Sequence, residues 1–183
     1  MLTAGVTETI DDLSEILALQ KRNLKQHLSP AEKAAEGFLT MQFSLSMLKE
    51  LHDLAPSVVV RDEKKIVAYA IVLLNEGRHS YPDLESMFVN LETLRWKERP
   101  LTDYRYYVMG QICVDKDYRG QHVFDMLYQQ HRKLYNRQFD CIVTEISTTN
   151  SRSMRAHERT GFKTIHRYTD HLDEWNVVLW DWN

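Results

Sequence analysis

The segment from Tyr104 to Ile146 constrains the fold more than any other part of the chain. Residues Tyr104–Val114 are rich in aromatic and β-branched side chains, which is typical of a strand, and Arg119–Arg137 carries apolar side chains at helical spacing. A further strand is predicted at Cys141–Ile146. Because a strand–helix–strand succession in one sheet forms a right-handed crossover, these two strands are predicted to be parallel neighbours.

The remaining patterns place helices and antiparallel strands around this unit. The predicted elements are, in order, helices over Ile10–His27 and up to Pro56, an antiparallel pair over Val58–Val60 and Ile66–Leu74, a helical excursion within Arg78–Thr102, the strand–helix–strand unit, a short helix from Ser151 to Gly161, and strands over Phe162–Tyr168 and Trp175–Trp182. This order predicts one α/β domain over residues 1–183 with a mixed sheet.

The charge balance narrows the classes of partner. Lys and Arg number 23 against 26 Asp and Glu, so the net charge is −3, which disfavours nucleic acid as a partner. The N-terminal stretch carries Glu8, Asp11 and Asp12 where a signal peptide needs basic and apolar residues, and no run is apolar enough to span a membrane. Cys113 and Cys141 each lie within an apolar run, without metal-ligand or redox spacing. We expect a cytoplasmic protein with no metal site.

A candidate anion site follows the strand that ends at Val114. Residues Asp115–Arg119 form a tight turn and the next helix begins just after it. The first amides of a helix have no partner within it and lie at the positive end of its dipole, so this turn suits a diphosphate. The alternative interpretation is an ordinary turn whose amides face water.

Two motifs favour the first interpretation. Arg119-Gly120-Gln121-His122-Val123-Phe124 lies on the pattern Q/R-x-x-G-x-G/A. In the unit Asn150–Phe162, the residues Asn150, Ser153, His157, Gly161 and Phe162 fall on the pattern N-x-x-A-x-x-x-Y-x-x-x-G-F. The chain therefore resembles the Gcn5-related N-acetyltransferase (GNAT) family, closely from about Val108 to Phe162.

The resemblance implies a fold, an activity and a cofactor site. The fold is a central, mixed, mostly antiparallel sheet with one splayed parallel pair and helices on both faces. The activity is acyl-CoA-dependent transfer of an acetyl group from acetyl-CoA to an amine acceptor. The backbone of Ile112, Cys113 and Val114 is expected to pair with pantetheine, the turn of Arg119, Gly120, Gln121, His122, Val123 and Phe124 to hold the pyrophosphate, and Asn150 to bond the pantetheine arm.

Two residues depart from the family pattern at the pyrophosphate turn. His122 and Phe124 occupy positions where the family prefers glycine or alanine, and a side chain there can obstruct the diphosphate. Alternatively, His122 points outward and Phe124 turns into the core. In the second case the pocket is preserved.

Glu145 and His157 are the candidate catalytic residues. They match the positions of the glutamate and tyrosine proposed as base and acid in GNAT members that acetylate ribosomal-protein N-termini. Alternation along Cys141–Ser147 makes Glu145 the lone acid on an otherwise apolar strand, where a raised pKa would suit a base, and an imidazole is competent to protonate a thiolate. The alternatives are a Glu145 that faces solvent or an arginine, and a His157 without a catalytic role.

The acceptor amine is not identified by the sequence. Its site is expected between the region of Phe38–Leu48, the Arg78–Thr102 excursion and the final hairpin, which flank the cofactor opening in the family. The stripe of Leu84, Met87, Phe88 and Leu91 suits either a cover for this site or a homodimer contact. A catalytically silent GNAT-fold module that binds CoA or another acidic ligand is the alternative function.

Overall fold

One twisted sheet of seven strands organises the molecule, with the order β1-β2-β3-β6-β7-β9-β8. The structure is a computed structural model that describes residues 1–182, without the side chains of residues 34–36. The strands of this sheet are β1 (Leu2–Val6), β2 (Val58–Asp62), β3 (Lys65–Leu73), β6 (Tyr106–Val114), β7 (Cys141–Ser147), β8 (Lys163–Thr169) and β9 (Glu174–Asp181). Every neighbouring pair is antiparallel except β6 and β7, so the predicted mixed sheet with one parallel pair is confirmed.

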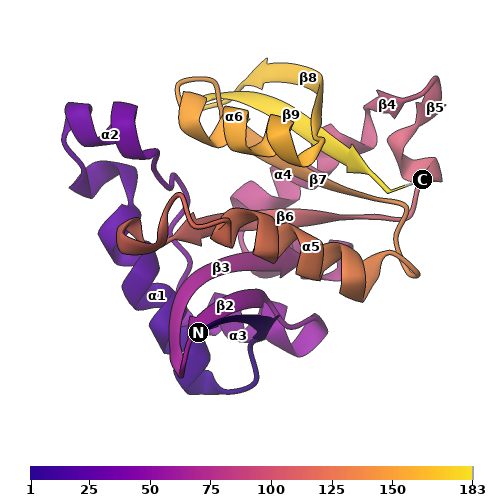
Figure 1. The fold of residues 1–183 in the computed structure, drawn as a ribbon. Coiled ribbons are helices and arrows are strands. Elements are labelled where there is room, and N and C mark those ends of the chain that lie inside the picture. The colour runs from indigo at the N-terminus through magenta and orange to yellow at the C-terminus, as the bar shows by residue number, and fades with distance from the viewer. Residues whose placement is uncertain (183) are drawn as a thin grey trace.

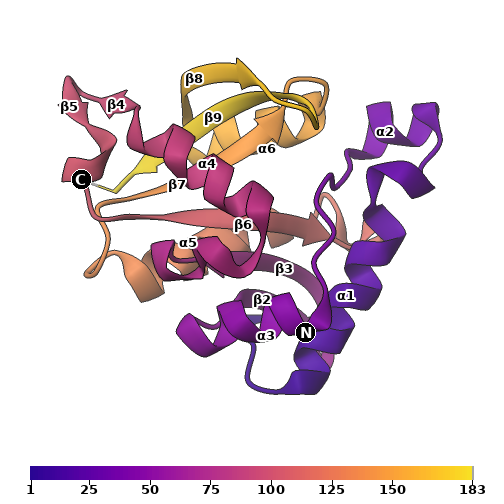
Figure 2. The ribbon, with the colours of Figure 1, turned by 180° about the vertical axis from the view of Figure 1, so that it is seen from behind.

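Helices cover both faces of this sheet. They are α1 (Ile10–Asn23), α2 (Pro30–Glu36), α3 (Leu45–Leu54), α4 (Pro82–Glu92), α5 (Val123–Tyr135) and α6 (Ser151–Thr160). Figure 1 shows α5 and α6 in front of the sheet, and Figure 2 shows α1, α3 and α4 on the opposite face. Side chains alternate across each strand, so two apolar cores form, one beneath each helical layer.

The ends of the helices explain their boundaries. Thr9 caps α1, because its hydroxyl accepts the Asp12 amide while the Asp12 carboxylate accepts the Thr9 amide. Pro82 occupies the first turn of α4, and Gly161 ends α6 with a φ of 114°, in the left-handed region that favours glycine. None of the helices in the described part of the chain combines the length and apolar character that a membrane crossing needs.

Three local predictions differ from the structure. The N-terminal strand β1 was not expected, because five residues that include Gly5 give a weak pattern and pair only with β2 at the sheet edge. The second predicted helix is two helices, α2 and α3, joined by an irregular segment. The predicted helical excursion within Arg78–Thr102 contains α4 and also a short hairpin of two strands with two residues each, β4 (Arg95–Trp96) and β5 (Arg99–Pro100).

Short 3-10 turns complete the chain at Lys25–His27, Asn75–Ser80, Leu101–Asp103 and Lys116–Tyr118. The apolar stripe of α4 contacts the chain's own core, where Leu84, Phe88 and Leu91 are buried. Both cysteines are buried with free thiols, and burial raises the pKa of each thiol to about 12.

Candidate active site

The parallel strands β6 and β7 separate after only three residue pairs. Their pairing runs from Tyr106 and Cys141 to Val108 and Val143. The Thr144 hydroxyl donates to the Met109 carbonyl at 2.8 Å, just past the last pair. Beyond it β6 continues to Val114 paired only with β3, so its other backbone edge is open (Figure 1). An open strand edge can hydrogen-bond an extended ligand as a further strand would.

A turn with two left-handed residues joins β6 to α5. Gly120 has a φ of 77° and His122, the residue before the first turn of α5, has a φ of 59°. A Cβ on Gly120 would meet no atom within 4 Å, so conformation rather than space favours glycine there. The first residues of the helix that follows, Val123 and Phe124, line the same cleft as Ile112 and Val114 of β6, and the free amides of a helix start suit an anion.

The two departures from the glycine pattern leave this turn uncovered. The His122 side chain is 86% exposed, and its Nδ1 lies 3.0 Å from the Asp125 carboxylate. The Phe124 ring packs edge-on against the rings of Tyr128 and His157, with 5.1 Å between centroids in each case. His122 therefore points outward, and Phe124 is part of the wall between α5 and α6.

One cleft of about 480 Å³ gathers most of the residues predicted for the cofactor. Its lining includes Ile112, Cys113, Val114, Arg119, Gly120, His122, Val123, Phe124 and Asn150. The remaining predicted residue, Gln121, is exposed and donates its side-chain amide to the Asp117 carbonyl at 2.9 Å. The side-chain amide of Asn150 donates to the Phe38 carbonyl at 3.0 Å, and its oxygen caps α6 at the Ser153 amide. An amide nitrogen has two hydrogens, so one remains for a further acceptor.

A row of arginines on α6 also lines this cleft, and sequence reasoning missed it. Arg152, Arg155 and Arg159 lie three and four residues apart, which places them on one helix face. Arg155 and Arg159 are exposed, and no acidic side chain in the described part of the chain pairs with either. The regular spacing of these arginines within the motif Asn150–Phe162 could have predicted a basic helix face. The cleft thus combines a helix N-terminus with a cationic wall, as a ligand with several phosphates requires.

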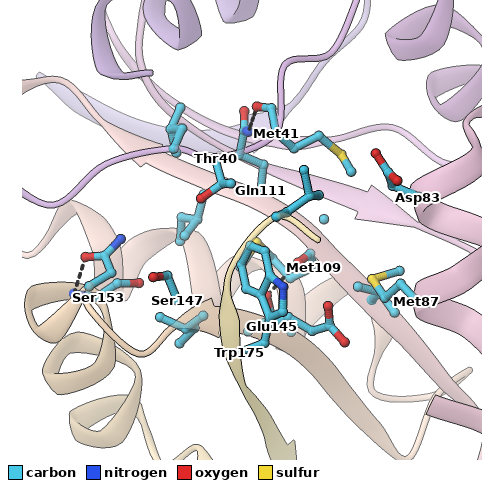
Figure 3. Close-up of a pocket in the computed structure, with 18 of the residues that line it drawn as sticks. Thr40, Met41, Asp83, Met87, Met109, Gln111, Glu145, Ser147, Ser153 and Trp175 are labelled. Carbon is cyan, nitrogen blue, oxygen red and sulfur yellow. Dashed lines mark hydrogen bonds between the residues drawn. The ribbon is translucent and has the colours of Figure 1, made fainter. Parts of the chain in front are cut away.

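A second pocket of about 130 Å³ is lined by residues of both β6 and β7 (Figure 3). All three segments expected to surround the acceptor line it: Phe38–Met41, the α4 residues Asp83, Leu84 and Met87, and the Tyr168, Asp170, Leu172 and Trp175 side chains of the final hairpin. Glu145, His157 and Ser147 are also in its lining.

Glu145 carries an unpaired carboxylate oxygen in this pocket. Tyr168 donates its hydroxyl to Oε2 at 2.8 Å, whereas Oε1 is buried and has no hydrogen-bond partner among the described residues. Figure 3 shows the carboxylate projecting on the side of Met87, beside the Trp175 ring. Burial raises the pKa of Glu145 to about 7, against the bond from Tyr168, which lowers it. A carboxylate with this pKa can accept a proton from an amine near neutral pH.

His157 is buried, and both of its ring nitrogens are engaged. Nδ1 lies 2.8 Å from the Ser153 carbonyl, so we assign the ring hydrogen to Nδ1. Nε2 then accepts the Tyr128 hydroxyl at 2.6 Å. Burial lowers the pKa of His157 to about 4, so the ring is neutral at pH 7. This arrangement does not support the expected role as proton donor, because Nε2 carries no proton and the Nδ1 proton is bonded to a backbone carbonyl.

Three buried side-chain amides hold the irregular segment Gly37–Ser44 over the site. Asn150 bonds Phe38, Gln111 donates to the Met41 carbonyl at 2.7 Å, and Gln20 bonds both backbone groups of Phe43. The backbone of Leu39 pairs with Asn23 and Lys25 in a single bridge, and the three amides satisfy further backbone groups of the segment. Sequence patterns missed Gln111 because its role depends on contacts between distant residues. Among the described residues there is no group of three or more His, Cys, Asp or Glu side chains that could hold a metal.

Comparisons with solved structures agree with this fold. Over 99% of this chain and 94% of the other, the fold matches the ribosomal-protein-S18-alanine N-acetyltransferase of Escherichia coli with a TM-score of 0.64 at 15% identity. A chain of the NatC complex bound to Gag peptide and CoA matches with a TM-score of 0.65 at 13% identity, over 100% and 99% of the two chains. The putative acetyltransferase yncA of Salmonella typhimurium, solved with its cofactor acetyl-CoA, matches with a TM-score of 0.63 at 12% identity, over 100% and 94%.

These identities are low, so the likeness shows the fold alone. A search of curated protein sequences finds no match. The model of the family described as "Acetyltransferase (GNAT) family", however, matches residues 11–162, which include the splayed strands, the turn between β6 and α5, and α6. The chain therefore belongs to the GNAT acetyltransferase family.

Proposed function

We propose that the protein transfers an acetyl group from acetyl-CoA directly to a primary amine. One observation carries this proposal: the phosphate-suited cleft and the pocket of Glu145 meet at the β6–β7 opening. The residues that line both are Phe38, Leu39, Ile112, Asn150 and Ser153. A thioester at this junction would face the free Glu145 oxygen. Proximity of this kind supplies much of the rate enhancement of a two-substrate transfer.

The residues of the cleft fit the three parts of acetyl-CoA. The amides at the start of α5 would hold the diphosphate, and Arg155 and Arg159 suit further phosphate oxygens. The open edge of β6 at Ile112–Val114 would pair with the pantetheine amides. Bound there, acetyl-CoA supplies an activated acyl group, whose carbonyl the β6 amides would polarise.

Glu145 is the proposed base. An alkyl ammonium has a pKa of about 10.4 and no free electron pair, so it must lose a proton before attack. The unpaired Oε1 of Glu145 would accept that proton. The amine nitrogen then forms a bond to the acyl carbon as the carbon–sulfur bond breaks, and the second nitrogen proton leaves with the thiolate as the CoA thiol.

The transfer needs no covalent enzyme intermediate. The two thiols are buried with raised pKa values, so neither supplies a thiolate at pH 7. His157, neutral and bonded to Tyr128, shapes the wall that Phe124 packs against. The observation that favours an enzyme over a silent binding module is the unpaired oxygen of Glu145 in the pocket.

The test is acetyl transfer from acetyl-CoA to a panel of primary amines, with thiol release followed and the acetylated product identified by mass spectrometry. Wild-type protein is expected to form product. Glu145→Gln is expected to bind acetyl-CoA normally and to lose at least about a hundredfold in kcat, the usual contribution of a general base. Unchanged turnover in this variant would show that Glu145 is not the base.

A further inference from the structure

The ionisable side chains of the Glu145 pocket, here called the acceptor pocket, are almost all acidic. Three carboxylates line it, those of Asp83, Glu145 and Asp170, and its lining includes no lysine or arginine among the described residues. The histidine in the lining, His157, is neutral at pH 7 because burial lowers its pKa. One of the carboxylate oxygens, Oε1 of Glu145, is buried and has no hydrogen-bond partner among the described residues, so it is free to accept a bond from an amine in the pocket.

Two basic side chains outside the lining already contact carboxylates. Lys25 lies 2.8 Å from the Asp173 carboxylate, and His171 lies 3.4 Å from that of Asp83. A carboxylate on a substrate would therefore meet the carboxylates of the pocket. Among the described residues, no lysine or arginine of the lining would neutralise it. Repulsion between like charges disfavours binding of a substrate that carries such a carboxylate, and a neutral substrate escapes this repulsion.

The walls of the pocket are apolar and adaptable. Met41, Met87 and Met109 surround the space beside Glu145, and Trp175 forms one side (Figure 3). Thioether side chains fill irregular gaps and accept aromatic or branched groups of different shape. The pocket therefore suits an apolar stem attached to the amine.

Resting on the proposed function, we propose that the acceptor is a primary amine on an apolar stem with no carboxylate next to the amine. This chemistry is shared by apolar alkyl- or arylalkylamines and by peptide N-termini with an apolar first side chain, whereas free α-amino acids are excluded. The carboxylate of an amino acid lies two bonds from its nitrogen and would enter the same acidic space when the nitrogen approaches Glu145.

Phenylalanine and its amide test this proposal, because they share the stem and differ in the carboxylate. We expect phenylalanine amide and phenethylamine to be acetylated, with a kcat/KM at least about a hundredfold above that of phenylalanine, as repulsion of a few kcal/mol predicts. A tetrapeptide amide with N-terminal phenylalanine distinguishes the two sources. If it exceeds phenethylamine the acceptor is a peptide, and the reverse order indicates a small amine.

A charge variant shows whether the pocket causes the discrimination. Asp83→Asn is expected to lower the ratio of kcat/KM for phenylalanine amide to kcat/KM for phenylalanine about tenfold. Asp11→Asn is the matched control, because Asp11 also lies in the first turn of a helix but does not line the pocket. It is expected to leave the ratio unchanged.

Direct binding separates this proposal from the proposed function. Phenylalanine amide and phenylalanine are titrated calorimetrically into the protein saturated with CoA. Binding of the amide but not of phenylalanine, without turnover, would support the proposed ligand selectivity of the pocket and refute the transferase. Equal use of the two compounds, or no binding and no turnover of the amide, would overturn the acceptor proposal.

Discussion

Tyr168 sets the pH at which the candidate base works, so Tyr168→Phe should move the pH profile of the enzyme. The Tyr168 hydroxyl donates to Glu145 and stabilises the charged carboxylate, which keeps the pKa of Glu145 lower than burial alone would. Without this bond the pKa must rise. A base has to be deprotonated, so the kcat of the variant should rise with pH at higher pH than that of the wild type.

The size of the shift follows from the hydrogen bond that is lost. Bonds to charged groups contribute about 1.5–3 kcal/mol, and one pKa unit corresponds to about 1.4 kcal/mol. Because Tyr168 is only half-buried, the lower end applies, which is about one unit. From a starting pKa of about 7, the ionised fraction at pH 7 would fall from about half to about a tenth. The kcat should therefore fall about fivefold at pH 7 and recover at pH 9.

The assay is the pH dependence of kcat at saturating acetyl-CoA and amine, followed by thiol release. Tyr135→Phe is the control, since Tyr135 donates to the Pro56 carbonyl on the far side of α5 and does not touch Glu145. Its midpoint should equal that of the wild type. A Tyr168→Phe profile with an unchanged midpoint would refute Glu145 as the group that limits kcat.

Three further predictions concern stability and cofactor binding. The pKa of Glu145 is about 7 in the folded protein and 4.5 in the unfolded chain, so the free energy of unfolding falls as the pH rises between these values. Glu145→Gln, which cannot ionise, should therefore stabilise the protein by up to about 3 kcal/mol at pH 8 and by little at pH 4.5. Urea unfolding at the two pH values measures this difference. The pH dependence of stability that His157 contributes has the opposite sign, because its pKa is about 4 in the folded protein and 6.5 in the unfolded chain, which therefore binds the proton first as the pH falls. The free energy of unfolding of the wild type should fall by up to about 3 kcal/mol through this residue between pH 6.5 and 4. That of His157→Gln should fall less over the same range. Arg155→Gln with Arg159→Gln should weaken CoA binding about tenfold or more, as charge-assisted bonds to phosphate predict, with Arg137→Gln as an exposed control; an equal effect of the control would refute a specific contact.

Local patterns predicted the parts of the fold whose side chains repeat with a clear period. The strand ending at Val114, the helix after it and the next strand were predicted within a few residues, because burial on one or both faces enforces that period. β1 was missed because a five-residue edge strand contributes little pattern of its own. The segment Gly37–Ser44 was missed because buried amides from three other elements hold it, which no local pattern records.

The candidate site shows the same division. The motifs pointed to the turn between β6 and α5 and to Glu145, since these depend on sequence spacing, and their roles towards a cofactor and a proton stay predictions. The chemical state of His157 could not be predicted, because it depends on Tyr128, 29 residues away, and on the burial of both side chains. Tyr168 and Asp83 join the pocket only through the tertiary placement of the final hairpin and of α4, which are far apart in sequence.

Calorimetric titration of the purified protein with acetyl-CoA, and separately with CoA, tests the central claim most directly. We predict saturable binding of one molecule of either compound per chain, competitive between the two, and weaker for the Arg155→Gln, Arg159→Gln protein. The bound protein should also melt at higher temperature, because a ligand at about 100 times its Kd adds about 2.7 kcal/mol of stability. Absence of both binding heat and a melting shift would contradict the account, since the cleft between β6, α5 and α6 would then not be a CoA site.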